Sequence, residues 1–110
     1  MQNVQTYGRF KFHSVGQGLF YTGCIIDECI DFNFVYDCGG KKQYIDHEVD
    51  TYVENLGNKE LDLVVLSHLH ADHINGVREL LKPNENSQTP KRTRVVMPYC
   101  IFIICMKALL

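Results

Sequence analysis

A nearly continuous apolar run directly before a cluster of histidines places the strongest constraint on the fold of this chain. Residues 61–66 contain one polar side chain, Asp62, which is the pattern of a strand buried in the centre of a sheet. Apolar residues at helical spacing follow from about Asp72 to Leu81, and a proline at position 83 ends them. A buried strand followed by a helix predicts a βα unit, and so a sheet covered by helices.

The first third of the chain has a different period. Apolar residues alternate with polar ones from Arg9, and two further strand patterns follow, Leu19–Ile26 and Phe32–Asp37. Glycine at positions 16 and 18 and the polar stretch Asp27–Asp31 mark the turns between them. Three strands joined by short turns predict an antiparallel meander.

The remaining segments complete a single α/β (α+β) domain over residues 1–110. Spacing of three and four residues predicts a helix over Asp46–Leu56, closed by Gly57. The polar stretch Lys82–Arg94 is interpreted as a loop, and Val95–Met97 as the next strand. Hairpins followed by βα units predict a mixed sheet with helices on one face.

Composition excludes several functional classes. Apolar residues are 45% and charged residues 22%, so the chain is expected to fold, and a net charge of −2 gives no electrostatic argument for a nucleic-acid or membrane partner. The five cysteines (24, 29, 38, 100 and 105) are odd in number and contain no C-x-x-C pair, which favours reduced thiols and a cytoplasmic location. The first twelve residues lack an apolar signal segment, and Val95–Cys105 is too short to span a bilayer.

Chemistry is concentrated at the junction of the buried strand and the helix after it. His68 and His70 are two residues apart in a tight loop, so both rings can point the same way, and Asp72 and His73 follow at the first helical turn. Imidazole and carboxylate suit zinc and similar ions, and two such pairs could hold two ions that jointly activate a water. A purely structural use of these side chains is the alternative. An isolated histidine such as His13 is interpreted as solvated or hydrogen-bonded.

The stretch His68-Leu69-His70-Ala71-Asp72-His73 resembles the H-x-H-x-D-H signature of the metallo-β-lactamase-fold superfamily, and its flanking residues are similar too. The resemblance implies that His68 and His70 hold one metal ion and that Asp72 and His73 hold a second. It also makes Asp72 the candidate catalytic base. Zn²⁺, as one or two ions, is the cofactor implied, with Mn²⁺ or Fe as alternatives.

Two shorter matches accompany this motif. Tyr36-Asp37-Cys38-Gly39-Gly40 resembles the family's first motif, which implies that Asp37 orients a metal ligand by hydrogen bonding. A simple Asx turn before the glycines explains Asp37 equally well. The segment Val15-Gly16-Gln17-Gly18 resembles a hairpin of the subgroup related to bacterial DNA-uptake channel proteins, although turn chemistry alone accounts for both glycines.

The resemblance covers about residues 7–98 and implies the N-terminal half of an αββα sandwich, with residues 99–110 an apolar tail that could be a core strand or a prematurely ended reading frame. The family's downstream ligands are absent, because no histidine follows His73 and no acidic residue follows Glu85. A homodimer, a second polypeptide or a longer form of the protein is therefore expected to complete the fold.

Two functions remain open at this stage. The first is a metal-dependent hydrolase whose substrate is an ester, thioester, lactam or phosphodiester. The second is a non-catalytic, truncated half-domain or interaction module. Fold alone does not decide between them, since one fold hosts many chemistries.

Overall fold

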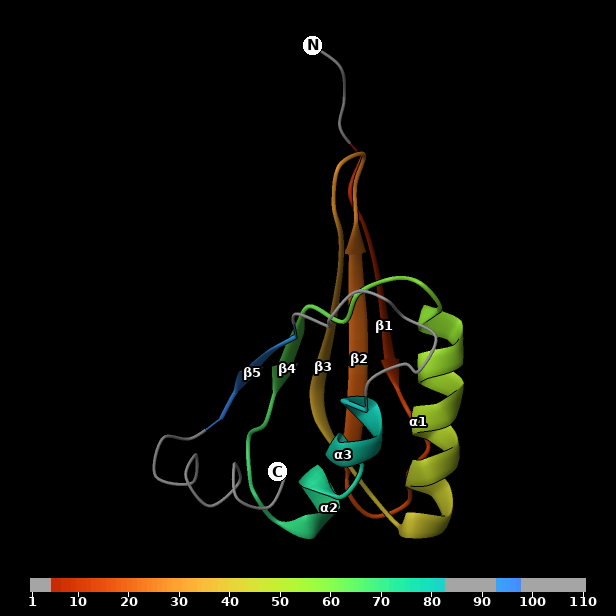
Figure 1. Cartoon of the computed structure of the whole chain (residues 1–110), viewed down its shortest axis with the longest axis vertical. Coiled ribbons are helices and arrows are strands. Elements are labelled where there is room, and N and C mark those ends of the chain that lie inside the picture. Colours follow the sequence, from red (N-terminus) through yellow and green to blue (C-terminus); the bar gives the residue numbers. More distant parts are fainter. Residues whose placement is uncertain (1–4, 83–92, 98–110) are drawn as a thin grey trace.

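The computed structural model describes residues 5–82 and 93–97, which form one mixed sheet with helices against it (Figure 1). The predicted loop Lys82–Arg94 lies mostly outside these residues, and the apolar tail lies wholly outside them. Along the chain the elements are β1 (Tyr7–Phe12), β2 (Leu19–Ile26), β3 (Asp31–Gly39), α1 (Lys42–Leu56), β4 (Leu63–Val65), α2 (Ala71–Ile74), α3 (Val77–Leu80) and β5 (Arg94–Val96).

The order of the strands in the sheet, β1-β2-β3-β4-β5, follows the sequence. Strands β1, β2 and β3 pair antiparallel, which confirms the predicted meander. Strands β3, β4 and β5 pair parallel, with Val35 beside Val64 and Val64 beside Val95. The predicted mixed sheet is therefore confirmed, and the parallel pairs bring the carboxyl ends of β3 and β4 to the same edge.

The helices differ from the sequence prediction in two places. Helix α1 begins at Lys42, four residues before the predicted start at Asp46. The prediction overlooked Ile45, which lies four residues before Val49 and is buried on the same face of the helix. The prediction of a single helix over Asp72–Leu81 was wrong, since the segment forms two one-turn helices, α2 and α3. The break lies at Gly76, whose backbone N–H donates to the carbonyl of Cys38 at 2.9 Å. A tertiary hydrogen bond to β3 thus replaces the continuation of the helix.

The core lies between the helices and one face of the sheet. Phe20, Val35 and Val64 come from three adjacent strands, and they are fully buried together with Ile45 of α1 and Leu80 of α3. Alternate residues of a strand point to opposite faces, so these residues define the covered face. The prediction that helices lie on one face of the sheet is confirmed.

The opposite face carries a group of apolar side chains, which we call the outer aromatic face: Phe10, Phe12, Tyr21, Phe34 and Tyr36. Phe12 is 74% exposed and Phe10 58% exposed, and the ring centroids of Phe12 and Tyr21 are 4.5 Å apart. Exposed aromatic groups of this kind mark interaction surfaces in folded proteins. In the described part of the chain, no helix is long and apolar enough to cross a bilayer.

Candidate metal centre

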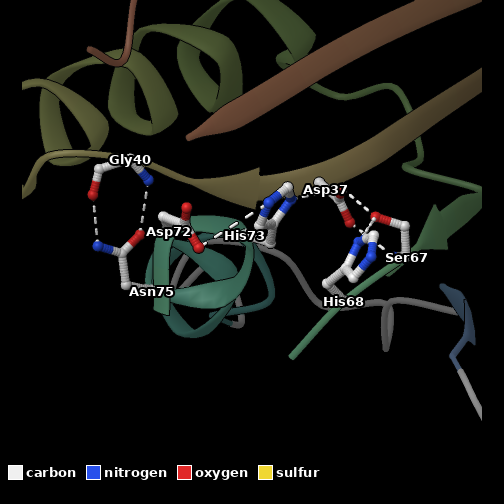
Figure 2. Close-up of polar contacts among 7 residues, drawn as sticks. All are labelled: Asp37, Gly40, Ser67, His68, Asp72, His73 and Asn75. Carbon is white, nitrogen blue, oxygen red and sulfur yellow. Dashed lines mark hydrogen bonds and ion pairs between the residues drawn. The ribbon is translucent and has the colours of Figure 1, made fainter. Parts of the chain in front are cut away.

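The site is built where three segments meet at one edge of the sheet. Asp37 lies near the end of β3, His68 follows β4 by three residues, and His73 belongs to α2 (Figure 2). One ligand atom from each of these three residues lies within 4.8 Å of the other two. The parallel pairing of β3 and β4 causes this convergence, because it places the residues at and after their carboxyl ends side by side.

Asp37 organises the site from a fully buried position. Its Oδ1 accepts the backbone N–H of Ser67 at 2.7 Å, and its Oδ2 accepts the Ser67 hydroxyl and His73 Nδ1, the latter at 2.8 Å. A buried carboxylate requires such donors to offset the loss of hydration. Its φ of 57° lies in the left-handed region, which aspartate tolerates better than most residues. All recorded hydrogen bonds of the carboxylate thus run to distant segments rather than to an Asx turn.

These contacts fix the protons on two imidazole rings. A carboxylate only accepts hydrogen bonds, so His73 Nδ1 carries the proton that it shares with Asp37. The single hydroxyl proton of Ser67 also goes to Asp37, so Ser67 Oγ can only accept from His68 Nδ1, 3.0 Å away. In their neutral form both rings are therefore held as the tautomer whose Nε2 has a free lone pair, the form that binds a metal ion.

The other two predicted ligands lie beside this group without joining it. The exposed ring of His70 has its centroid 6.3 Å from that of His68, and Asp72 Oδ1 lies 3.8 Å from His73 Nε2. Ligand atoms around a tetrahedral zinc ion are about 3.3 Å apart, given bonds of about 2.0–2.1 Å. The Asp72–His73 pair is close to that separation, whereas His70 lies outside the group that brings its ligand atoms together. The residues present fit a divalent ion with nitrogen and oxygen ligands.

Two glycines allow the segments to approach closely enough. A Cβ placed on Gly39 would lie 2.4 Å from the backbone N of His73, and one placed on Gly18 would lie 2.4 Å from the backbone O of Asp72. Such distances exclude any side chain, since the contacting atoms belong to the backbone. The turn glycine of the first hairpin therefore has a packing role at α2 that the sequence does not reveal.

Asn75 fixes α2 against the end of β3, a role that the sequence analysis missed. Its Oδ1 accepts the N–H of Gly40 at 2.9 Å, and its Nδ2 donates to the carbonyl of Gly40 at 2.6 Å (Figure 2). The only sequence signal was its place just after the histidine cluster, because a lone asparagine before glycine otherwise indicates a turn.

His13 lies outside this group. It hydrogen-bonds Glu48 Oε2 at 3.1 Å through Nδ1 and Thr22 Oγ1 at 2.8 Å through Nε2, which confirms the prediction of a hydrogen-bonded histidine. Burial lowers the pKa of His13, against the opposing effect of its hydrogen bond to Glu48. Burial has the opposite effect on the Cys38 thiol, because it disfavours the thiolate anion: it raises the pKa of Cys38 and keeps this thiol protonated and unreactive.

Comparison with known proteins agrees with the fold. The family model of the metallo-beta-lactamase superfamily matches residues 25–93. The chain belongs to this superfamily, a family of metal-dependent hydrolases.

A particular relative is the anti-Pycsar protein Apyc1 of Paenibacillus sp. (strain J14), to which the chain is 32% identical over 81 residues. This alignment includes 73% of the chain but only 28% of the relative. The chain thus spans little more than a quarter of the length of the protein it matches.

Proposed function

We propose that this chain is the metal-binding part of a hydrolase that activates water with one or two divalent ions, zinc first among them and Mn²⁺ or Fe as alternatives. The observation that carries the proposal is the pair of oriented imidazoles, because Asp37 and Ser67 hold His73 and His68 in the metal-binding tautomer. A structural role alone would not require both Nε2 atoms to remain free.

Each residue has a separate task in this proposal. His68 and His70 hold one ion, and Asp72 and His73 hold the other. A divalent ion, when bound, supplies the Lewis acidity that makes water a nucleophile near neutral pH. Asp72, whose carboxylate is partly exposed, accepts the proton of the attacking water, while the buried Asp37 orients His73. The substrate is an ester, thioester, lactam or phosphodiester.

The proposal includes a partner. Two protein ligands for each ion fall short of the three that a catalytic zinc site normally has. We propose that a second copy of the chain, a further polypeptide or a longer form of this protein supplies the remaining ligands and covers the outer aromatic face, where Phe12 is 74% exposed. The unpaired thiols of Cys24, Cys29 and Cys38 are consistent with a reducing compartment such as the cytoplasm.

A non-catalytic half-domain is the second candidate. The position of His70 outside the Asp37–His68–His73 group favours it, because a ligand needed for catalysis is usually held in place by its neighbours. In that case the chain keeps the fold and loses tight metal binding.

Metal content per chain, measured on the purified protein by elemental analysis, separates the two. We expect about one or two ions per chain, in keeping with a one- or two-metal site, and a near-complete loss in the His68→Ala/His70→Ala variant. His47→Ala is the matched control, because His47 is an exposed histidine of α1 outside the centre, and it should retain the metal. A folded chain that holds no metal would exclude a metal centre completed by a second copy of the chain and would favour the half-domain.

Activity is then measured on the metal-loaded protein with one substrate from each class. Turnover that is lost in Asp72→Asn while metal content is retained would support the role of Asp72 as base. Metal binding without turnover on any class would reject catalysis by this chain, although not its metal site.

A further inference from the structure

A cleft lies on the covered side of the sheet, beside the C-terminal turns of α1. It has a volume of about 230 Å³ and is bounded by β1, β2, β3 and the residues Tyr52, Asn55 and Leu56 of α1. The metal centre lies at the other end of this helix, next to Gly40, which precedes α1. The cleft and the metal centre are therefore separate sites.

All the charged residues that line the cleft, among those the structure describes, are positive. Arg9 and Lys11 reach the cleft from β1, Lys59 reaches it from the turn after α1, and none of its described lining residues is acidic. Arg9 and Lys11 are alternate residues of one strand, so both point to the same face of the sheet. Their register partners, Cys24 and Thr22, also line the cleft.

Among the described residues, two of these three cations have no ion-pair partner. Lys59 Nζ pairs with Asp31 Oδ2 at 3.1 Å, whereas Arg9 and Lys11 form no ion pair within the described part of the chain. Two unpaired cations at the mouth of a concave site create a field that attracts an anion. A phosphate group, which carries a charge of about −1.5 to −2 near neutral pH, matches the two charges better than a single carboxylate does.

The cleft also offers polar groups of the right kind. The side chains of Asn33 and Asn55 line it, and so does Tyr52, whose buried hydroxyl has no hydrogen-bond partner. Asn33 is already engaged, because its Nδ2 donates to Asp31 Oδ1 and to the carbonyl of Glu60. Asn55, which is exposed, therefore remains as a neutral donor beside the cations.

The volume of the cleft limits the size of the ligand that it can hold. Sites for drug-sized ligands occupy about 300–1,000 Å³, so a cleft of about 230 Å³ suits a smaller group. We propose that this cleft binds the phosphate group of a small molecule, through Arg9 and Lys11 with support from Lys59.

The positive charges on β1 also have an explanation that involves no ligand. Charged residues on edge strands also prevent aggregation by discouraging strand pairing, and β1 is an edge strand of the described sheet. Strand β5 lies at the opposite edge and carries the exposed Arg94. A variant that removes Arg94 together with the exposed Lys42 changes the charge by the same amount and leaves the cleft intact.

The test is a titration of the full chain with inorganic phosphate, followed by amide NMR shifts at constant ionic strength with chloride as the reference. We expect saturable shifts at Arg9, Thr22 and Lys59. In Arg9→Gln/Lys11→Gln the affinity should fall at least about tenfold, because two charge-assisted hydrogen bonds are lost. In Arg94→Gln/Lys42→Gln it should change less than about twofold, the effect of distant charges screened by salt. Glycerol 3-phosphate serves as a second probe, and tighter binding than phosphate would identify an organic monoester as the ligand.

The proposal fails if phosphate and glycerol 3-phosphate shift these amides no more than chloride does. It also fails if the two double variants lose affinity equally, since that would indicate a general charge effect. Shifts confined to Asp37 and His73 would place the phosphate at the metal centre and would likewise overturn it. Both variants alter exposed side chains, so a thermal melt of each should match that of the unmodified chain.

Discussion

Replacing Asp37 by asparagine removes one charge from a buried position and keeps the shape of the side chain. The carboxylate accepts three hydrogen bonds, two from Ser67 and one from His73 Nδ1. An amide can accept only through its oxygen, so its NH₂ group must face a former donor in either orientation. Facing His73, the NH₂ donates to Nδ1 and moves the ring proton to Nε2, the atom needed for the metal. Facing the N–H of Ser67, it leaves two donors in contact.

The expected loss of stability follows from these two orientations of the introduced amide, because each leaves a buried polar group without a suitable partner. A buried donor or acceptor without a partner costs about 1–3 kcal/mol, so Asp37→Asn should lower the free energy of unfolding by that amount. Loss of the group that orients a metal-binding histidine typically weakens metal affinity by about 10–100-fold. Both effects are expected together, because one side chain serves the fold and the ligand.

Urea denaturation of the metal-free chain measures the first effect, and competitive zinc titration measures the second. Asp46→Asn is the matched control, since Asp46 is half-exposed and pairs with Lys42 at 3.5 Å across one helical turn. Such surface pairs contribute about 0–1 kcal/mol, so this variant should resemble the unmodified chain in both assays. The reasoning is refuted if Asp37→Asn binds zinc within about twofold of the control, a change far below the loss stated above.

Three further predictions follow from packing and protonation. Gly39→Ala should lower the free energy of unfolding by about 1–3 kcal/mol, because its Cβ would lie 2.4 Å from the backbone of His73. In Gly8→Ala the close contacts of the Cβ are with the exposed, movable ring of Phe10. An equal loss of stability in both variants, measured by urea denaturation, would contradict the packing argument. His13 has a lowered pKa in the folded chain, so the unfolded chain binds a proton at this histidine more readily. The free energy of unfolding should therefore fall as the pH drops below about 6.5. Thermal melts over a series of pH values should show a weaker pH dependence of stability for His13→Gln. Tyr52→Phe removes a buried hydroxyl that has no hydrogen-bond partner among the described residues, so it should raise the free energy of unfolding by up to about 1 kcal/mol in phosphate-free buffer. A loss of similar size would show that the hydroxyl is satisfied.

The pattern of the sequence determined the class of fold. Alternation predicted β1–β3 as a meander, and the apolar run Leu61–Leu66 predicted a central strand, which β4 confirms over a shorter span. These features depend on residues near one another in the chain, where the period of apolar side chains reports directly on local geometry. The histidine cluster predicted a metal centre for the same reason, since its candidate ligands are contiguous.

Only the tertiary structure decided which groups meet. His73 and Asp37 are 36 residues apart, and Ser67 and Asp37 are 30 apart, so no local pattern encodes their hydrogen bonds. The break at Gly76 has the same origin, because the carbonyl of Cys38 competes for an N–H that helical periodicity assigns to the helix. Sequence thus determined the elements and the candidate ligands, whereas strand register and the close approach at Gly39 determined the site.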